Sequence, residues 1–193
     1  MTTDNFDFLN KSAEHAAKRL LGCILERQLG DEIVRVKIIE TEAYDGTDAA
    51  SHSYKRRTPR TDIMFGPAGH LYVYFTYGMH YCCNIVVGHE DVGAAVLIRA
   101  VEPIDGEATM MTFRRKTGVL LTNGPAKLCQ ALSIDKQLNG HSLRHSPLKL
   151  IITPPIDPSQ MQKSSRIGIS RAKEKKWRFY MKDNPYVSSG QKQ

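Results

Sequence analysis

The sequence is poor in the features that mark secreted, zinc-binding and membrane proteins. Its 193 residues include four cysteines, and no two of them form a Cys-x-x-Cys pair. This argues against a zinc knuckle and a disulfide framework, and favours a reducing compartment. The polar N-terminus has no signal-peptide pattern, and no apolar run approaches the length of a membrane span. We therefore expect a soluble intracellular protein of the cytoplasm or nucleoid, or of the nucleus in a eukaryote, without a membrane partner.

The histidines and the glycine patterns also exclude several kinds of enzyme. His52, His70, His80 and His89 show no zinc-protease spacing among themselves, and the zinc deaminase pattern is missing. The sequence has no Gly-x-Gly-x-x-Gly, no phosphate-binding Gly-Lys-Ser/Thr loop and no Gly-x-Ser-x-Gly. We expect neither a metal ion nor a cofactor.

Basic residues are in surplus. Lys and Arg number 27 against 20 Asp and Glu, for a formal charge of +7. Such a surplus suggests a polyanionic partner, either nucleic acid or an acidic membrane surface. The length fits one domain spanning 1–193, with 1–8 and 189–193 expected to be flexible, and a monomer without an obligate protein partner suffices.

Strand-like runs come in neighbouring pairs, and helices are scattered between them. This order favours a mixed α/β (α+β) domain with a curved, mainly antiparallel sheet, flanking helices and a protruding hairpin, rather than βαβ repeats. The predicted helices are 12–21, 107–115 and 126–132. The predicted strands are 33–39, 71–76, 80–87, 94–100, 148–153 and 177–181.

The first predicted strand turns acidic at its end. If the chain stays extended, Glu40, Glu42 and Tyr44 share one face with three apolar residues, namely Val34, Val36 and Ile38. A carboxylate at the end of an apolar face is partly desolvated, which raises its pKa and its basicity. The competing interpretation is that both glutamates leave the sheet and lie in water.

An aromatic hairpin and two basic segments suggest a surface for nucleic acid. Tyr72 and Tyr74 share a strand face and could simply pack there, whereas Tyr77 stands beside the glycine of the turn. We expect the Tyr77 ring to project into solvent, where it could wedge into a base stack. The loop 55–60 could clamp phosphates or could simply be solvated, and 166–178 adds further basic residues around a glycine.

Several ordered motifs resemble the alkyladenine (3-methyladenine) DNA glycosylase family. The resemblance covers roughly 9–188. The matching segments are Glu40-Thr41-Glu42-Ala43-Tyr44, Ala49-Ala50-Ser51-His52-Ser53, Thr58-Pro59-Arg60, Leu71-Tyr72-Val73-Tyr74, Tyr77-Gly78-Met79, Asn84, Leu97-Ile98-Arg99-Ala100, Gly124-Pro125-Ala126-Lys127-Leu128-Cys129-Gln130-Ala131-Leu132 and Arg178-Phe179-Tyr180.

The resemblance implies a role for each matching position. Glu42 resembles the general base that activates water, and Arg99 a residue near that water and the target phosphate. Tyr44 resembles the aromatic on one face of the flipped base, with His52 and Tyr74 on the other.

Further positions resemble DNA contacts. Asn84 matches the side chain at the exocyclic edge of the purine, and Tyr77 the residue that fills the gap in the duplex. Contacts to the DNA backbone are expected from Arg56, Arg57, Arg60, Met64 and Lys127.

The sequence thus predicts a monofunctional glycosylase that flips damaged purines out of double-stranded DNA and leaves an abasic site. A Schiff-base mechanism needs a lysine nucleophile, and neither 42–44 nor 72–84 contains one. A non-catalytic nucleic-acid-binding domain, or an enzyme of another nucleic-acid or folate-type substrate, remains an alternative. Glu42 discriminates, because a binder of polyanions has no use for a half-buried carboxylate. Glu40→Gln is expected to be much milder than Glu42→Gln.

Overall fold

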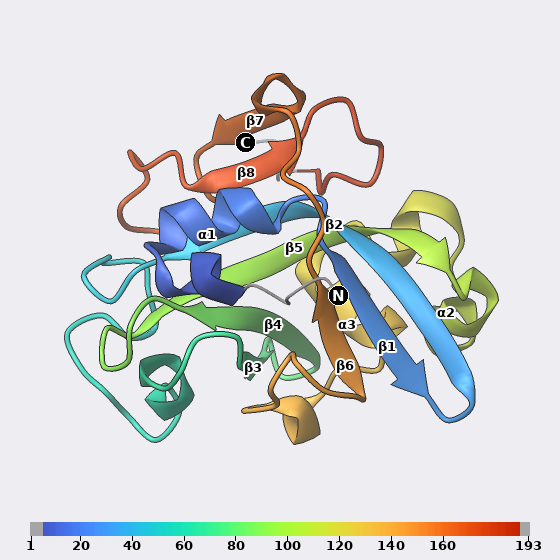
Figure 1. Ribbon diagram of the computed structural model, residues 1–193, viewed down its shortest axis with the longest axis horizontal. Coiled ribbons are helices and arrows are strands. Elements are labelled where there is room, and N and C mark those ends of the chain that lie inside the picture. Colours follow the sequence, from blue (N-terminus) through green and yellow to red (C-terminus); the bar gives the residue numbers. More distant parts are fainter. Residues whose placement is uncertain (1–5, 190–193) are drawn as a thin grey trace.

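The computed structural model describes residues 6–189 as a curled antiparallel sheet with flanking helices (Figure 1). The helices are α1 (Ala13–Leu20), α2 (Glu107–Arg114) and α3 (Pro125–Ala131). The strands are β1 (Ile24–Leu29), β2 (Glu32–Tyr44), β3 (Leu71–Thr76), β4 (His80–Val87), β5 (Ala94–Asp105), β6 (Leu148–Ile151), β7 (Met161–Ser164) and β8 (Arg178–Met181). The main path of the sheet runs β3-β4-β5-β2-β1-β6, with β8 paired to β2 and β7 to β8. The predicted α+β class is confirmed.

Helix α1 begins and ends as the sequence indicated. The Ser12 hydroxyl accepts the amide hydrogen of His15 at 3.3 Å, which caps the first turn. The buried residues follow one helical face: Ala13, Ala16, Ala17 and Leu20. This face packs on the sheet, where Thr41 donates its hydroxyl to the Ala17 carbonyl at 2.9 Å. In Figure 1, α1 lies across the face formed by β2 and β5.

The β3–β4 hairpin has the strand bounds that the sequence predicted. Its turn has positive φ at both central residues, 52° at Tyr77 and 68° at Gly78. The Met79 amide donates to the Thr76 carbonyl at 3.3 Å across the turn. Because Thr76 pairs with His80, the connection has three residues, Tyr77, Gly78 and Met79. Glycine adopts a positive φ at no steric cost, whereas a tyrosine there is uncommon.

Strand β2 exchanges one neighbouring strand for another halfway along its length, and this exchange determines which residues surround Glu40 and Glu42. Its first half pairs with β1 as far as Lys37, whereas Glu40 to Glu42 pair with β8. On its other edge β5 follows β2 as far as Tyr44, with irregular register around Ile38 and Glu40. The strand was predicted to end at Ile39. It continues because backbone pairing on both edges outweighs the polar side chains that suggested a strand end.

Some elements differ from the predictions. Strands β1 and β7 were not predicted, because their polar and charged residues break the apolar alternation. The segment 1–8 was expected to be flexible, yet Phe6 is buried in a 3-10 helix that spans Phe6–Asn10. The remaining parts of the expected flexible ends, 1–5 and 190–193, lie outside the described residues. Among residues 6–189, no helix is long and apolar enough to cross a bilayer.

Candidate active site

Glu42 is fully buried in β2, where β5 and β8 flank it. The Tyr44 hydroxyl donates to Oε2 at 2.8 Å, and the Ile167 amide donates to Oε1 at 2.8 Å. The guanidinium group of Arg99 also approaches Oε1, at 3.4 Å from Nη1. Each oxygen of the carboxylate therefore already has a hydrogen-bond partner within the protein.

The environment of Glu42 perturbs its titration. Burial raises the pKa of Glu42 above its usual range, and the charge of Arg99 is the largest influence in the opposite direction. The expectation of a desolvated carboxylate with a raised pKa is confirmed for Glu42. The competing interpretation, in which both glutamates lie in water, is wrong, because β8 covers this part of the strand.

A cavity of about 670 Å³ is lined by the three residues that contact this carboxylate, Tyr44, Arg99 and Ile167, whereas Glu42 itself does not line it. Its walls come from loop 49–52, the hairpin β3–β4, β5 and the segment 167–171. Several predicted site residues line it together: Tyr44, His52, Met64, Tyr74, Tyr77, Asn84 and Arg99. The volume falls within the range of pockets that hold small organic ligands, and it is ample for a purine base.

Part of the cavity wall is aromatic. The rings of His52 and Tyr74 meet edge to face, with centroids 4.7 Å apart, and Tyr72 stacks on Tyr74 at 5.5 Å. His52 Nδ1 lies 3.0 Å from the Tyr72 hydroxyl. Burial lowers the pKa of His52 to about 4. The imidazole is therefore neutral near pH 7, and it presents one donor and one acceptor nitrogen.

Tyr44 lines the cavity from the end of β2 and is backed by a cation. The guanidinium group of Arg166 lies over its ring, 4.7 Å from the centroid. Arg166 is itself buried, donates to the Ala43 carbonyl at 2.8 Å and forms an ion pair with the buried Asp48. These contacts fix the Tyr44 ring from the side occupied by Arg166. Nothing in the sequence signalled this pair, whose members are far apart along the chain.

Asn84 and Cys82 line the cavity from β4. The Asn84 amide donates to the Tyr72 carbonyl at 3.0 Å, which leaves its Oδ1 and one N–H for a ligand. Asn84 is buried, so an unmatched ligand group would be costly there. Burial raises the pKa of the Cys82 thiol to about 11. The thiol is therefore protonated near pH 7 and is a poor nucleophile.

The tip of the hairpin is solvent-exposed and apolar. Tyr77 is 86% exposed and Met79 71% exposed. The expectation that the Tyr77 ring projects into solvent is confirmed. An exposed tyrosine on a turn with positive φ contributes little to the core.

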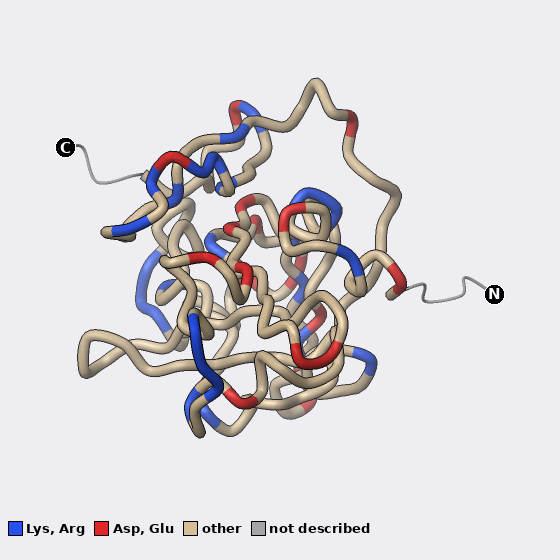
Figure 2. Tube along the Cα trace, turned by 90° about the vertical axis from the view of Figure 1, so that its left-hand side faces the viewer, with Lys and Arg blue, Asp and Glu red and all other residues tan. Residues whose placement is uncertain are grey.

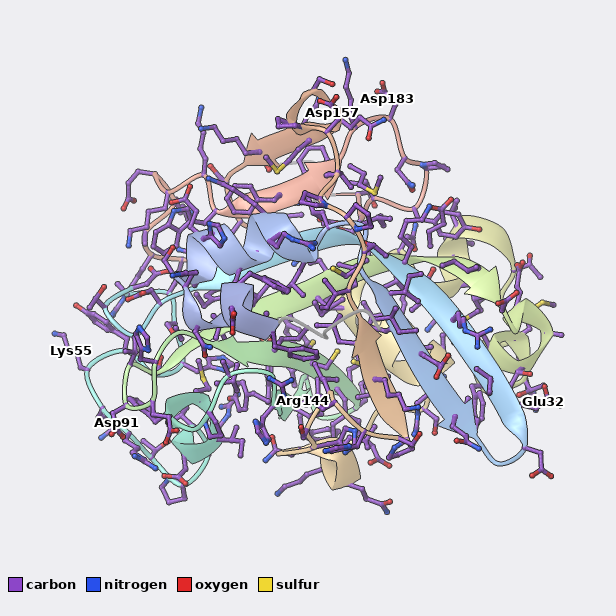
Figure 3. All side chains as sticks on the ribbon, viewed as in Figure 1. Glu32, Lys55, Asp91, Arg144, Asp157 and Asp183 are labelled. Carbon is purple, nitrogen blue, oxygen red and sulfur yellow. The ribbon has the colours of Figure 1, made fainter. Side chains whose placement is uncertain are left out.

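The basic loop contains one arginine that is already paired. Arg57 forms ion pairs with Asp62 at 2.5 Å and with Asp91 at 3.0 Å. In Figure 3 the labelled Lys55 and Asp91 project from two loops on the same side of the molecule. Both ion pairs are exposed, so each is weak and screened by salt. A phosphate would nevertheless compete with Asp62 and Asp91 for Arg57.

Two other arginines of this loop border a second cavity. Arg60 lies over the Tyr74 ring at 5.5 Å from its centroid. Arg56, Arg60 and Arg171 border a cavity of about 380 Å³ that adjoins the larger one at His52. Figure 2 shows the side of the molecule that carries this loop, where Lys and Arg positions (blue) occur both low on the molecule and near its upper left. The two basic segments predicted from the sequence therefore lie on one side of the molecule.

Two predicted backbone contacts lie away from the exposed surface. Met64 is buried and packs with Tyr72 beneath the cavity. The contact of Met64 with the DNA backbone stays a prediction; the structure places its buried side chain in the cavity wall. Lys127 is partly buried in α3, where its Nζ donates to the Asn123 side chain at 2.6 Å. Burial lowers the pKa of Lys127.

Glu40 lies at the centre of a buried network. It accepts hydrogen bonds from Arg178 Nε at 2.5 Å and from Ser188 Oγ at 2.8 Å, and Arg99 Nε is 3.2 Å away. Glu40 is fully buried. Glu40→Gln was expected to lower activity much less than Glu42→Gln. That expectation no longer follows, because the change removes a carboxylate that pairs with the buried guanidinium groups of Arg99 and Arg178. The sequence could not reveal Ser188, which is far from Glu40 along the chain.

The structure gives no support for a metal centre. Among the described residues, no three His, Cys, Asp or Glu side chains gather into a possible metal site. All four cysteines are buried as free thiols. The cavity wall contains the guanidinium group of Arg99, the neutral imidazole of His52 and the amide of Asn84, and the Glu42 carboxylate lies behind it.

Comparison with known proteins identifies relatives over most of the chain. A family model described as Methylpurine-DNA glycosylase matches residues 7–185. A Carboxydothermus hydrogenoformans protein named "Putative 3-methyladenine DNA glycosylase" is 48% identical over 175 residues, which cover 89% of this chain and 91% of the relative. Relatives of the same name are 46% identical in Francisella tularensis (90% and 92% covered) and 44% in Methanoculleus marisnigri (94% and 96%).

Proposed function

The chain belongs to the methylpurine-DNA glycosylase family, and from this premise we propose that it flips damaged purines out of duplex DNA into the 670 Å³ cavity. Membership makes it a DNA glycosylase, an enzyme that hydrolyses N-glycosyl bonds. The proposed substrates are alkylated and deaminated purines, namely 3-methyladenine, 7-methylguanine, hypoxanthine and ethenoadenine. The proposed product is an abasic site.

The observation that carries the proposal is the position of Glu42 directly behind the wall of an aromatic cavity, in contact with the lining residues Tyr44 and Arg99. A flipped base would lie between Tyr44 and the pair His52 and Tyr74, where stacking contributes about 1–3 kcal/mol per base. This offsets the few kcal/mol needed to unstack the nucleotide. A purine alkylated at N3 or N7 carries positive charge, so it is attracted to π faces and leaves the sugar readily.

Glu42 supplies the proposed chemistry. Cleavage of the glycosidic bond builds oxocarbenium-like charge on the sugar, which a nearby carboxylate stabilises. The same carboxylate takes the proton from the attacking water. Its oxygens are occupied by Tyr44, Ile167 and Arg99 in this structure. An ionised carboxylate has about four acceptor sites, so these three contacts leave one for the attacking water.

The absence of a suitable nucleophile supports a monofunctional reaction. None of the described residues that line the cavity is a lysine, so the amine needed for a Schiff base is lacking there. The Cys82 thiol is protonated, as its pKa of about 11 requires. Water is then the nucleophile, and the sugar–phosphate backbone stays intact.

Duplex oligonucleotides that carry one lesion each provide the test. The protein is incubated with each duplex, and abasic sites are revealed by alkali, with an undamaged duplex as control. We expect base release from at least one lesion and no strand cleavage without alkali. Borohydride should trap no covalent complex. The proposed function is overturned if every lesion duplex remains intact after alkali.

A further inference from the structure

Ser188, from the end of the chain, enters the buried network with three polar groups. Its amide and its hydroxyl donate to the carboxylate of Glu40 at 2.6 and 2.8 Å. Its carbonyl accepts from Arg178 Nη2 at 3.1 Å, and its Oγ accepts from Arg99 Nε at 3.2 Å. Ser188 is buried, although the residues on either side of it are partly or fully exposed. This is unusual engagement for a residue so near the end of a chain.

The contacts of Arg99 show what this engagement achieves. Its Nε end is held by Ser188 Oγ and by Glu40 Oε1, both at 3.2 Å. Its Nη1 reaches Glu42 Oε1 at 3.4 Å, a long contact that a small rotation would break. Because the guanidinium group is planar, anchoring Nε sets the direction of Nη1. The anchoring of one end therefore controls the contact at the other end.

From this geometry we propose that Ser188 is a positioning residue, which together with Glu40 holds Arg99 against Glu42 so that the C-terminal segment completes the catalytic site. The proposal rests on the proposed function, because it assigns Glu42 and Arg99 to the reaction. Ser188 touches neither the base nor the water, and it acts through Arg99.

The hydroxyl, rather than the bulk of Ser188, carries this role. Removing Oγ takes one acceptor from Arg99 and one donor from Glu40 while the backbone contacts of Ser188 remain. Hydrogen bonds to charged groups are stronger than neutral ones, and their loss in a buried site is costly. Arg99 would then be held by Glu40 alone at its Nε end and would contact Glu42 less often.

Loss of that contact changes the titration of the site. The charged and titratable groups around Glu42 are Glu40 and Tyr44 from β2, Tyr74 from β3, Arg99 from β5 and Arg178 from β8. Of these, Arg99 opposes most strongly the rise of the Glu42 pKa caused by burial. A looser Arg99 lets the pKa of Glu42 rise further. Base release needs ionised Glu42, so the acid limb of the rate profile should move to higher pH.

The test compares Ser188→Ala with the wild type in the full chain. Single-turnover base release from a lesion duplex that the wild type cleaves is measured across pH, together with duplex affinity and thermal melting. We expect release at neutral pH to fall on the order of 10- to 100-fold. We also expect the acid limb to shift upward and duplex affinity to stay near that of the wild type. Ser188→Thr, which retains a hydroxyl, should restore both the rate and the profile.

A matched control and a second variant complete the design. Ser159→Ala removes an exposed hydroxyl that donates to Asp157 at 2.7 Å, and it should leave rate and profile unchanged. Asp157 is labelled in Figure 3, on the β7 side of the molecule. Ser188→Cys keeps an atom in place but forms poorer hydrogen bonds, so it should shift the acid limb in the same direction even if Ser188→Ala does not fold.

The outcomes separate the two proposals. A wild type that releases no base from any lesion refutes the proposed function. If the wild type releases base and Ser188→Ala or Ser188→Cys has the same rate and pH profile as the wild type, the role of Ser188 is overturned and the proposed function stands. A slower Ser188→Ala with an unshifted acid limb and a lowered melting temperature also overturns it, because only the fold would then depend on Ser188.

Discussion

Replacing Glu42 by glutamine removes the charge of the proposed base while nearly all its hydrogen bonds can persist. The new amide oxygen can accept from the Ile167 amide, in place of Oε1. The new amide nitrogen can donate to the Tyr44 hydroxyl, which now donates to Oε2. The shape of the buried site should therefore be retained.

The effect on rate follows from the role of the carboxylate. Loss of a general base typically costs about 10²–10⁴-fold. At about 1.4 kcal/mol per tenfold, this raises the barrier by roughly 3–5 kcal/mol. Duplex affinity should change little, because the side chain is fully buried and does not line the cavity.

The same substitution should stabilise the fold at neutral pH, although it slows the reaction. Burial raises the pKa of Glu42 in the folded protein. The folded state therefore binds a proton more readily than the unfolded state, and ionisation of Glu42 destabilises the fold as the pH rises above the usual carboxyl range. Glutamine avoids this cost. We expect Glu42→Gln to melt higher than the wild type at neutral pH, with the difference shrinking toward pH 4.

The measurements are single-turnover base release, duplex affinity and thermal melting at several pH values. Glu32→Gln is the control, because Glu32 is exposed and lies on the side of the molecule opposite Lys55 (Figure 3). Release by Glu42→Gln within a few-fold of the wild-type rate would remove Glu42 from the mechanism. A lower melting temperature together with lost affinity would instead assign Glu42 to the architecture of the fold.

Three further outcomes are expected. Tyr77→Ala should melt near the wild type because the ring is 86% exposed, yet it should lose release from paired lesions more than from mispaired ones; equal losses would argue against a wedge. Replacing Arg56 and Arg60 by alanine should flatten the slope of log K against log salt by about 0.9 per phosphate contact, more than Arg57→Ala does. Asn84→Ser should change the ratio of release among purines; equal losses on all substrates would place Asn84 in the scaffold.

The sequence predicted those elements whose determinants are local. The hairpin bounds were correct because two β-branched and aromatic runs flank a Tyr-Gly turn, and turn chemistry acts over a few residues. Helix α1 was recognised by its Ser12 cap and its alanine face. The exposure of Tyr77 followed from its place beside the turn glycine, because little of the neighbouring chain can cover it.

Features that depend on distant partners could not be predicted in this way. Strand β1 carries the sequence Ile-Leu-Glu-Arg-Gln-Leu, which gives no clear alternation, yet β2 and β6 hold it from both edges. Arg57 looked like a free phosphate contact, because its partner Asp91 is distant along the chain. Met64 was expected from the resemblance to contact the DNA backbone, yet it is buried beside Tyr72.

The exchange of partners along β2 connects these long-range features to the chemistry. If β2 kept β1 as its neighbour to the end, nothing would bring Arg178 beside Glu40 or the segment before β8 over Glu42. With β8 in that place, Glu42 is desolvated and stays close to the cavity. Ionised carboxylates are costly to bury alone, so the same exchange must bring cations, which Arg99 and Arg178 provide. The basicity of Glu42 is thus a property of three strands that meet, rather than of the short motif that contains it.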